Sequence, residues 1–561
     1  MNTNSIKEPR LVQLSAGSSN LFTVEYKERF LYSKYNPTRA VLGTIQSLEI
    51  LPGTLIVICG PALWYGLPEL LEKIPQDCSI VAIEKELPLF NLSKNKLSDY
   101  SDFPVDLISL ENLNNRITEI QSDNKIKRAI RIDFSASVSF NPDFYNQVVS
   151  AIQEAIALKW KNRLTLTKLG RLYSRNIFKN LYKLKNNYML SDFKNSVSKP
   201  IIVFGAGEST DIFFKEKDFS IIKNDFFTIA VDAALPALTL RGFKPDAVVG
   251  IESQFAVQKS YLQNKNSRII QFADLTGRPQ CTEILGADKV FFTSKYIQCN
   301  FLENIQNLTG TENLIPPMGS VGLTSTYIAL KLRKSDEVPI IVIGNDFSFK
   351  TGKTHCKGTP QHLNELLTCS RFKLPGNIGS SFREGAFICL DKNNRPIVTD
   401  KALLNYANIF NQVFSGTKNL FDGGRTGLPL GISRTEDIQQ FRNSGFNQIT
   451  QTDSIILGPE NLTPFGTKIK FNEIQKFLET EKTALIKIQS LLSCGEDSEY
   501  REASITLDQQ LKELLETRDY LYIHFPDGNQ LQLNSGYLKR IKAELSFFIK
   551  DINQSLLFLK N

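Results

Sequence analysis

The chain has 561 residues, more than one hydrophobic core usually organises, and we expect three domains. Apolar residues make up 42% and charged residues 22% of the chain, the composition of an ordinary globular protein. The net charge is +8, but lysines and arginines are scattered, so we expect no nucleic-acid partner, which would favour a basic stripe.

The apolar segments do not predict a membrane protein. The longest of them, LPGTLIVICGPALWYGLP, is interrupted by Pro52, Gly53, Gly60 and Pro61. Residues 1–19 contain no apolar core of a signal peptide. Eight dispersed cysteines without a CxxC pair favour reduced thiols, and together these features predict a cytoplasmic protein. Only three histidines occur and no HExxH motif, so we predict no bound metal.

Residues 1–190 predict an N-terminal Rossmann-like α/β domain that ends in a long helical linker. TLIVICG (54–60) is a continuous apolar run ending in glycine, typical of a strand buried on both faces. ALWYGLPELLEKI (62–74) has helical spacing, and SIVAIE (79–84) and AIRIDF (129–134) predict further strands. Strand, helix and strand in this order indicate βαβ units and a parallel sheet.

Residues 191–435 repeat this plan and predict a doubly wound α/β domain. A helix is expected over VGLTSTYIALKLRK (321–334). Strands are expected at PIIVF (200–204), FFTIAV (226–231), DAVVGI (246–251), RIIQFA (268–273), KVFFT (289–293) and PIIVIG (339–344).

Residues 436–561 predict a mainly helical C-terminal domain. FNEIQKFLETEKTALIKIQSLLS and SGYLKRIKAELSFFIKDINQSLLFLK have apolar residues at helical spacing. Between them, YLYIHFPDGNQLQLN (520–534) predicts a hairpin with Asp527-Gly528 at its turn, and His524 is expected to be structural.

Small, glycine or acidic residues follow nearly every predicted strand of the second region. In open parallel sheets, ligands bind outside the carboxyl ends of the strands, so this repetition predicts one shared site. A single acid in such a position is more often a helix cap. The residues are Gly205, Ala206, Gly207, Glu208 and Ser209 after the first strand, Asp232 after the second, Glu252 and Ser253 after the third, Asp274 after the fourth, and Asn345 and Asp346 after the sixth.

Two predicted helix starts could hold phosphate through backbone amides. KPIIVFGAGESTD (199–211) is neither a GxGxxG fingerprint, because Thr210 replaces the third glycine, nor a GxxxxGK[ST] loop. Gly319-Ser320 opens a second helix and could hold another oxygen of the same ligand. The alternative for both is a plain turn with an N-cap.

His355 lies in NDFSFKTGKTHCKGTPQH, a polar, glycine-rich segment after the last strand. It is a candidate acid or base on a lid over residues 348–360, with Gly352 and Gly358 as hinges. The alternative is an ordinary surface histidine.

Five blocks resemble the Maf (motility accessory factor) family, in the same order and at similar spacing. They are GAGESTD (205–211), AVDAALPALTLRGFKPDAVVGIES (230–253), GSVGLTSTYIAL (319–330), PIIVIGNDFSFKTGKTHCKGT (339–359) and GGRTGLPL (423–430). FLYSKYNPTRA (30–40) is also similar to the N-terminal part of Maf proteins.

The resemblance implies a sialyltransferase-like central domain that uses a CMP-activated nonulosonic acid and modifies Ser or Thr of flagellin. The donor is a substrate, and no cofactor is implied. Gly205, Ala206, Gly207, Ser209, Asp232, Ser253, Gly319, Ser320 and Asn345 would bind the donor, and His355, Asp346 and Glu252 would be catalytic.

The sequence departs from the family pattern at three positions. Glu208 replaces the usual proline and would repel a phosphate unless its carboxylate points away. Glu252 replaces an aspartate. Pro61 removes an amide donor from the Gly60-Pro61-Ala62 turn, so we expect no nucleotide there.

Two alternatives remain open. The central block also resembles a 6-hydroxymethylpterin diphosphokinase, which would bind ATP and Mg²⁺. The acids that could suit the Mg²⁺ are Asp232, Glu252, Asp274 and Asp346. The other alternative is a non-catalytic flagellar binding protein, for which Glu208 is the main argument.

Overall fold

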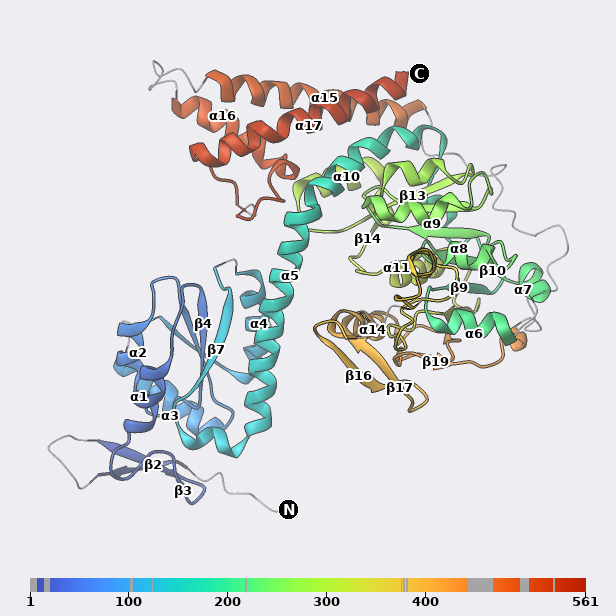
Figure 1. Ribbon diagram of the computed structural model, residues 1–561. Helices are drawn as coiled ribbons and strands as arrows, with labels where there is room; N and C mark the ends of the chain where they lie inside the picture. The colour runs from blue at the N-terminus through green and yellow to red at the C-terminus, as the bar shows by residue number, and fades with distance from the viewer. Residues whose placement is uncertain are drawn as a thin grey trace. The chain divides into compact units, whose positions relative to one another are not determined.

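The chain forms two compact units, Met1–Leu166 and Thr167–Asn561, and helix α5 (Pro142–Leu181) runs through the boundary between them. The computed structural model describes residues 8–14, 21–100, 104–123, 125–216, 219–374, 376, 379, 382–441, 468–494, 504–527 and 530–560 (Figure 1). Among the described helices, none has the length and apolarity to cross a membrane. The division into three domains stays a prediction.

The first unit contains the predicted parallel sheet. Its strand order is β6 (Val105–Ile108), β5 (Ser79–Ile83), β4 (Thr54–Cys59) and β7 (Arg128–Asp133). Every residue of β4 is buried, which explains its continuous apolar run. The helices of the unit are α1 (Arg39–Ser47), α2 (Leu67–Lys73), α3 (Leu87–Leu97), α4 (Leu113–Ser122) and the first part of α5, and a small antiparallel sheet joins β1 (Arg10–Gln13), β2 (Phe22–Tyr26) and β3 (Arg29–Phe30).

The turn after β4 is filled by side chains of the same unit. Helix α2 begins at Leu67 rather than at the expected residue 62, because Ala62 and Trp64 have positive φ angles of 42° and 61°. The hydroxyl of Tyr32 donates to the carbonyl of Pro61 at 3.0 Å and accepts from the amide of Leu63 at 3.0 Å. Tyr32 therefore holds the turn through both Pro61 and Leu63, and the expectation that no nucleotide binds there stays a prediction.

We expect Tyr32→Phe to lower the stability of the first unit by about 1–3 kcal/mol, because it leaves the buried amide of Leu63 without an acceptor. The measurement is the midpoint of urea unfolding of the full chain. Tyr35→Phe is the control, since Tyr35 is 90% exposed. Equal midpoints for the two variants would contradict the role of Tyr32.

The second unit is built on one large parallel sheet, and all six predicted strands are present. Its order is β14 (Leu314–Ile315), β13 (Lys289–Ser294), β12 (Ile270–Asp274), β11 (Ala247–Gly250), β10 (Phe227–Val231), β9 (Ile201–Phe204), β15 (Ile340–Ile343), β18 (Leu420–Asp422) and β19 (Ser433–Arg434), and β8 (Tyr188–Met189) pairs with β13. The sheet helices are α6 (Glu208–Glu216), α7 (Phe219–Asp225), α8 (Leu235–Thr239), α9 (Gln258–Leu262), α10 (Asn300–Thr309), α11 (Val321–Leu332), α12 (Pro360–Thr368) and α14 (Lys401–Phe414).

Helices cover both faces of this sheet, as predicted for a doubly wound domain. Ile201 and Val203 of β9 belong to a core with residues of α11 and α14. Ile202 and Phe204 belong to a second core with residues of α6 and α7. The alternation along one strand shows that its two faces are both buried.

The strand order reverses between β9 and β15. From β9 the chain adds β10 to β14 on one side, whereas β15, β18 and β19 extend the other side. In open α/β sheets, such a switch point opens a crevice at the carboxyl ends of the strands. The residues after β9 and β15 therefore occupy the position where this fold binds ligands.

The C-terminal helices are α15 (Lys468–Cys494), α16 (Ser504–Glu516) and α17 (Ser535–Lys560), and they share a core with α10 and with the last turns of α5. The predicted hairpin over 520–534 is wrong. Its described residues form no strand, and Asp519–Leu521 is a 3₁₀ helix. The four residues 520–523 are all buried, whereas a hairpin would alternate, and Gly528 lies outside the described residues.

Candidate active site

The carboxyl edge of the large sheet brings the residues predicted from strand ends to one side of the domain. Asp232 follows β10, Glu252 and Ser253 follow β11, and Asp274 ends β12. At the switch point, Gly205 to Gly207 follow β9 and Asn345 and Asp346 follow β15. The start of α11 lies at the same edge, because a Cβ atom on Gly322 would collide with the side chain of Asn345.

The carboxylate of Asp346 occupies the helix start that was predicted to hold phosphate. Its Oδ2 accepts a hydrogen bond from the amide of Ser209 at 2.8 Å. The Ser209 hydroxyl exchanges hydrogen bonds with the backbone of Thr426, and the amide of Gly207 donates to the carbonyl of Gly344 at 2.8 Å. The amides of Ser209 and Gly207 are therefore engaged within the protein, and donor binding by these residues stays a prediction.

Some polar groups of this edge have no partner within the described residues. They are the amides of Ala206 and Glu208, and the buried side-chain atoms Ser253 Oγ, Asp274 Oδ2, Asn345 Nδ2 and Asp346 Oδ1. Buried polar atoms are normally hydrogen-bonded, so each unpaired one calls for an explanation. Because they lie along neighbouring strand ends from β12 to β15, an elongated polar ligand would satisfy several of them.

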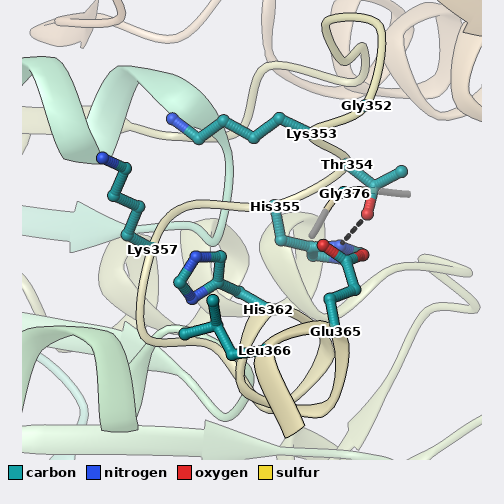
Figure 2. Close-up of a pocket in the computed structure, with 9 residues that line it drawn as sticks. All are labelled: Gly352, Lys353, Thr354, His355, Lys357, His362, Glu365, Leu366 and Gly376. Atoms are coloured by element: carbon teal, nitrogen blue, oxygen red, sulfur yellow. Dashed lines mark hydrogen bonds between the residues drawn. The ribbon is translucent and has the colours of Figure 1, made fainter. Parts of the chain in front are cut away.

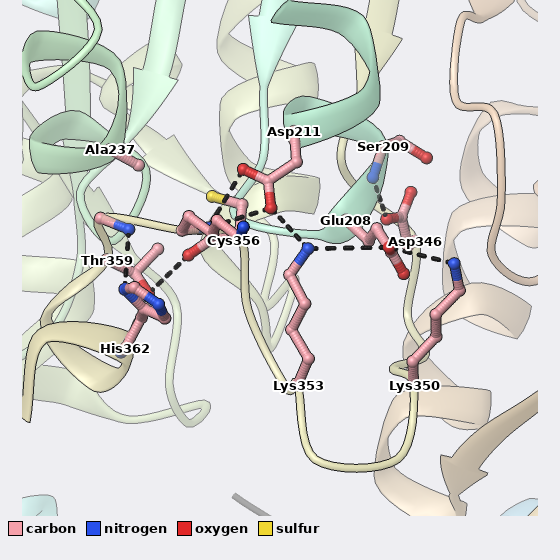
Figure 3. A network of polar contacts seen from close by, with 12 residues as sticks. Glu208, Ser209, Asp211, Ala237, Asp346, Lys350, Lys353, Cys356, Thr359 and His362 are labelled. Carbon is pink, nitrogen blue, oxygen red and sulfur yellow. Dashed lines mark hydrogen bonds and ion pairs between the residues drawn. The ribbon is translucent and has the colours of Figure 1, made fainter. Parts of the chain in front are cut away.

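The Glu208 carboxylate pairs with two lysines of the segment after β15. Its Oε1 lies 3.0 Å from Lys350 Nζ and 3.6 Å from Lys353 Nζ (Figure 3). Lys353 also contacts Asp211 Oδ2 at 2.6 Å. The glutamate is thus an anchor for the segment after β15, and the charge repulsion considered from the sequence is offset by two cations.

Asp211 is the centre of this anchor. Its side chain is 4% exposed, pairs with Arg241, and accepts from the amide of Lys357 at 3.1 Å through both oxygens. The amide of Cys356 donates to the carbonyl of Ala206 at 2.8 Å. The segment predicted to be a lid is therefore docked over the turn after β9.

We expect Asp211→Asn to loosen this segment, because the change leaves Arg241 and Lys353 without their buried carboxylate. Trypsin should cleave after Lys353 and Lys357 several-fold faster than in the wild type, as judged by mass spectrometry of early fragments. Glu208→Gln is the control. It removes the partly exposed ion pairs with Lys350 and Lys353, and their loss should change the cleavage rate far less. Equal rates for Asp211→Asn and wild type would show that the anchor does not restrain the segment.

Two buried carboxyl groups of the edge have pKa values raised above that of an ordinary aspartate. Burial raises the pKa of Asp232 to about 7, and the charge of Glu252 adds to the shift. Burial also raises the pKa of Asp346 to about 6, against the opposing hydrogen bonds from Ser209. Both groups can therefore exchange protons near neutrality, as an acid or base in a site must.

The raised pKa of Asp232 makes stability fall as pH rises. The folded protein binds this proton more tightly than the unfolded chain does, so wild-type stability declines between about pH 4 and pH 7. Asp232→Asn should abolish this decline and raise Tm at pH 8, by an amount equivalent to at most about 4 kcal/mol, with little change at pH 4. Asp288→Asn, at an exposed site, is the control. A Tm gain that is equal at both pH values would refute the titration.

His355 lines a hollow of about 270 Å³ beside the docked segment (Figure 2). The other lining residues are Gly352, Lys353, Thr354, Lys357, His362, Glu365, Leu366 and Gly376. His355 Nδ1 lies 3.0 Å from the Thr354 hydroxyl, and burial together with the charge of Arg383 lowers the pKa of the imidazole. The ring is therefore neutral at pH 7, the form in which it can accept a proton.

The remaining predicted residues have simpler surroundings. Glu252 is exposed and its Oε1 accepts from the amide of Gln254 at 2.9 Å. The Ser320 hydroxyl caps α11 by accepting from the amide of Gly322 at 3.3 Å, and keeps its own hydrogen free to donate. Gly319 is exposed beside it. The functional roles of all these residues stay predictions.

One group at the edge was missed by the sequence analysis. Asp422 ends β18 next to β15, forms a buried ion pair with Lys392, and accepts from the amide of Gly424 at 2.8 Å. LFDGGRTG contains the same signal as the other strand ends, an acid followed by glycine, but its strand has only three residues. Within the described residues, no group of three His, Cys, Asp or Glu side chains is arranged to hold a metal ion.

Comparisons with known proteins agree with this architecture. Residues 175–352 match the family model described as 6-hydroxymethylpterin diphosphokinase MptE-like. An uncharacterized protein of Treponema pallidum (strain Nichols) is 29% identical over 572 residues, which cover 97% of this chain and 94% of the relative. The solved structure of MAf glycosyltransferase from Magnetospirillum magneticum AMB-1 is similar with a TM-score of 0.53 and 14% identity, over 99% of this chain and 93% of the other.

The chain has the fold of a Maf glycosyltransferase. The similarity extends over both regions that flank the sheet, whereas the MptE-like match is confined to the central part. The resemblance to the Maf family stated from the sequence blocks is thus confirmed at the level of the fold.

Proposed function

We propose that this Maf-like chain is a glycosyltransferase that moves a nonulosonic sugar from a CMP-activated donor to Ser or Thr of flagellin. Such a modification, in the cytoplasm, would support flagellum assembly and motility. The observation that carries the proposal is the similarity in fold to a Maf glycosyltransferase over 99% of the chain. The row of unpaired polar atoms at the switch point supports a nucleotide-sugar as the ligand.

In the proposed reaction, the bond between the anomeric carbon and the phosphate oxygen breaks, and CMP leaves with the electron pair. Donors that face the phosphate stabilise the growing charge. We assign this role to the amide of Ala206, to Asn345 Nδ2 and to the Ser320 hydroxyl, which the protein leaves free to donate. Gly205 allows the close approach of the two turns, since a Cβ there would overlap Gly344 and Asn345.

The acceptor hydroxyl forms the new bond to the anomeric carbon and must lose its proton. We propose His355 as the base, followed by Asp346 and Glu252. The lowered pKa of His355 favours this role because the neutral imidazole predominates at pH 7. Asp232 and Ser253 would contact the nucleotide and the sugar from neighbouring strand ends.

A direct test combines calorimetry with mass spectrometry of the acceptor. The chain should bind CMP without added Mg²⁺, and incubation with a CMP-nonulosonic acid should add the mass of one sugar or more to unmodified flagellin. The experiment is run with two donors, CMP-pseudaminic acid and CMP-legionaminic acid. Binding of CMP without any transfer to flagellin would leave a binding protein rather than an enzyme.

The MptE-like match supports a second candidate, an ATP-dependent pterin diphosphokinase. That reaction would draw Mg²⁺ to the strand-end acids. In the structure, Asp346 Oδ2 and Asp274 Oδ1 accept hydrogen bonds from backbone amides, and within the described residues no group of three His, Cys, Asp or Glu side chains is arranged to hold a metal ion. Thermal shift with ATP and Mg²⁺ against CMP alone separates the candidates, since a ligand that binds the folded state raises Tm.

We expect His355→Ala to lower kcat by roughly 10²–10⁴-fold, the usual contribution of a general base, while the donor Kd changes little. Wild-type activity should rise with pH through the pKa of the imidazole, which lies below its ordinary value, and this acidic limb should vanish in the variant. The measurement is transfer to flagellin between pH 5 and 9. His362→Ala is the matched control in the same hollow. If His355→Ala keeps a normal kcat and profile, Asp346 becomes the leading candidate.

A further inference from the structure

A short strand beside the candidate active site has an open, apolar edge. Strands β16 (Ala386–Leu390) and β17 (Pro396–Asp400) form a two-stranded antiparallel ribbon next to α14 (Figure 1). The other edge of β17 is joined to the segment after β15, since Phe349 and Val398 exchange two hydrogen bonds of 2.8 and 2.9 Å. The outer edge of β16 pairs with no strand in the part of the chain that the structure describes.

The hydrogen-bond pattern leaves two residues of β16 with outward-facing backbone groups. In an antiparallel pair, residues alternate between bonding their partner and facing away. Val398 uses its amide and its carbonyl on Phe349, so the opposite residue, Ile388, bonds to neither. Leu390 lies opposite Pro396, which has no amide hydrogen. Ile388 and Leu390 thus present amides and carbonyls at the spacing of an added strand.

The side chains along this edge are unusually exposed for apolar residues. Ile388 is 74% and Leu390 is 59% exposed, and as alternate residues of one strand they lie on the same face. Further exposed apolar side chains precede the strand: Leu367 at 85%, Phe372 at 95%, Leu374 at 73% and Phe382 at 77%. An apolar edge of this kind favours pairing with another chain, and apolar exposure of this extent indicates an interaction surface.

We propose that the outer edge of β16 binds an extended, apolar segment of the acceptor protein as an additional strand. This rests on the proposed function, because only a protein acceptor needs such a platform. The ribbon adjoins the reacting edge: the Thr399 hydroxyl donates to the carbonyl of Phe347 at 3.0 Å, and Phe347 follows Asp346 directly. An acceptor segment on β16 would therefore extend the same small sheet that contains Phe349, with β16 and β17 between it and the segment that carries His355.

Charge argues for a foreign segment rather than a second copy of this chain. In the described residues of the segment before the strand, Arg371 and Lys373 are exposed, Arg383 is exposed and paired with Asp400, and one acid, Glu384, is exposed. Two copies that paired through β16 would bring these like charges together, which opposes association. A segment with acidic residues beside its apolar ones would be complementary.

The test is Ile388→Pro. Proline removes the outward amide hydrogen while the bonds between β16 and β17 remain, because Ile388 makes none of them. Unmodified flagellin of the same organism should bind about tenfold more weakly or worse by calorimetry, whereas CMP affinity and the urea midpoint stay unchanged. Ile388→Val keeps the amide and should bind flagellin like the wild type. Ile388→Lys, which adds a charge to the edge, should weaken binding in the same direction.

The outcomes separate this proposal from the proposed function. If flagellin binds Ile388→Pro and Ile388→Lys as tightly as wild type, the β16 edge is not the platform, even if sugar transfer is intact. If instead light scattering shows a wild-type dimer that Ile388→Pro converts to a monomer, the occupant is a second copy and the proposal is overturned. Failure of the wild type to bind CMP refutes the proposed function alone, because flagellin binding is measured without donor.

Discussion

The hydrogen bond from the amide of Ser209 to the carboxylate of Asp346 is the contact on which the candidate site depends. It joins the turns after β9 and β15 across the switch point, and glycines make room for it. A Cβ on Gly207 would lie 2.5 Å from Asp346 Oδ2, and one on Gly427 would lie 2.6 Å from its Cα. Leu428 adds a hydrogen bond from its amide to the Asp346 carbonyl at 2.8 Å. Three separate sequence blocks that resemble Maf proteins thus meet at one carboxylate.

This internal carboxylate changes which groups can bind a ligand. A helix start normally attracts an anion, but here the protein supplies the anion itself, so the phosphate of the proposed donor would be held beside the helix start rather than on it. The amide of Ala206 and the Asn345 side chain flank Asp346 and are free to donate. Burial raises the pKa of Asp346, so the group can become neutral more easily than an ordinary aspartate if the proposed phosphate binds beside it.

The sequence predicted the large sheet well because its strands are buried on both faces and read as continuous apolar runs. Such runs appear in β9 and β15, which are followed by the polar residues of the site. The short strand β18 was missed because three residues are too few to show a periodic pattern. The hairpin predicted over 520–534 was wrong because residues 520–523 are all buried in the fold, whereas a hairpin would alternate buried and exposed side chains. The contacts of Ser209 and Glu208 could not be predicted from sequence spacing, because their partners lie over a hundred residues away. Ser209 contacts Asp346, and Glu208 pairs with Lys350.

The ribbon of β16 and β17 and the candidate base share one side chain, Arg383. Its guanidinium lies over the ring of Phe349 at 5.1 Å and pairs with Asp400 at the end of β17. Burial lowers the pKa of His355, and the charge of Arg383 lowers it further. A positive group at this position disfavours the imidazolium, so it helps to keep His355 able to accept a proton. Because Arg383 lies shortly before β16 and pairs with Asp400 of β17, a partner strand that shifts this ribbon would also shift the charge that acts on His355. In the proposed reaction, binding of the acceptor to β16 would then change the pKa of His355 through the guanidinium of Arg383.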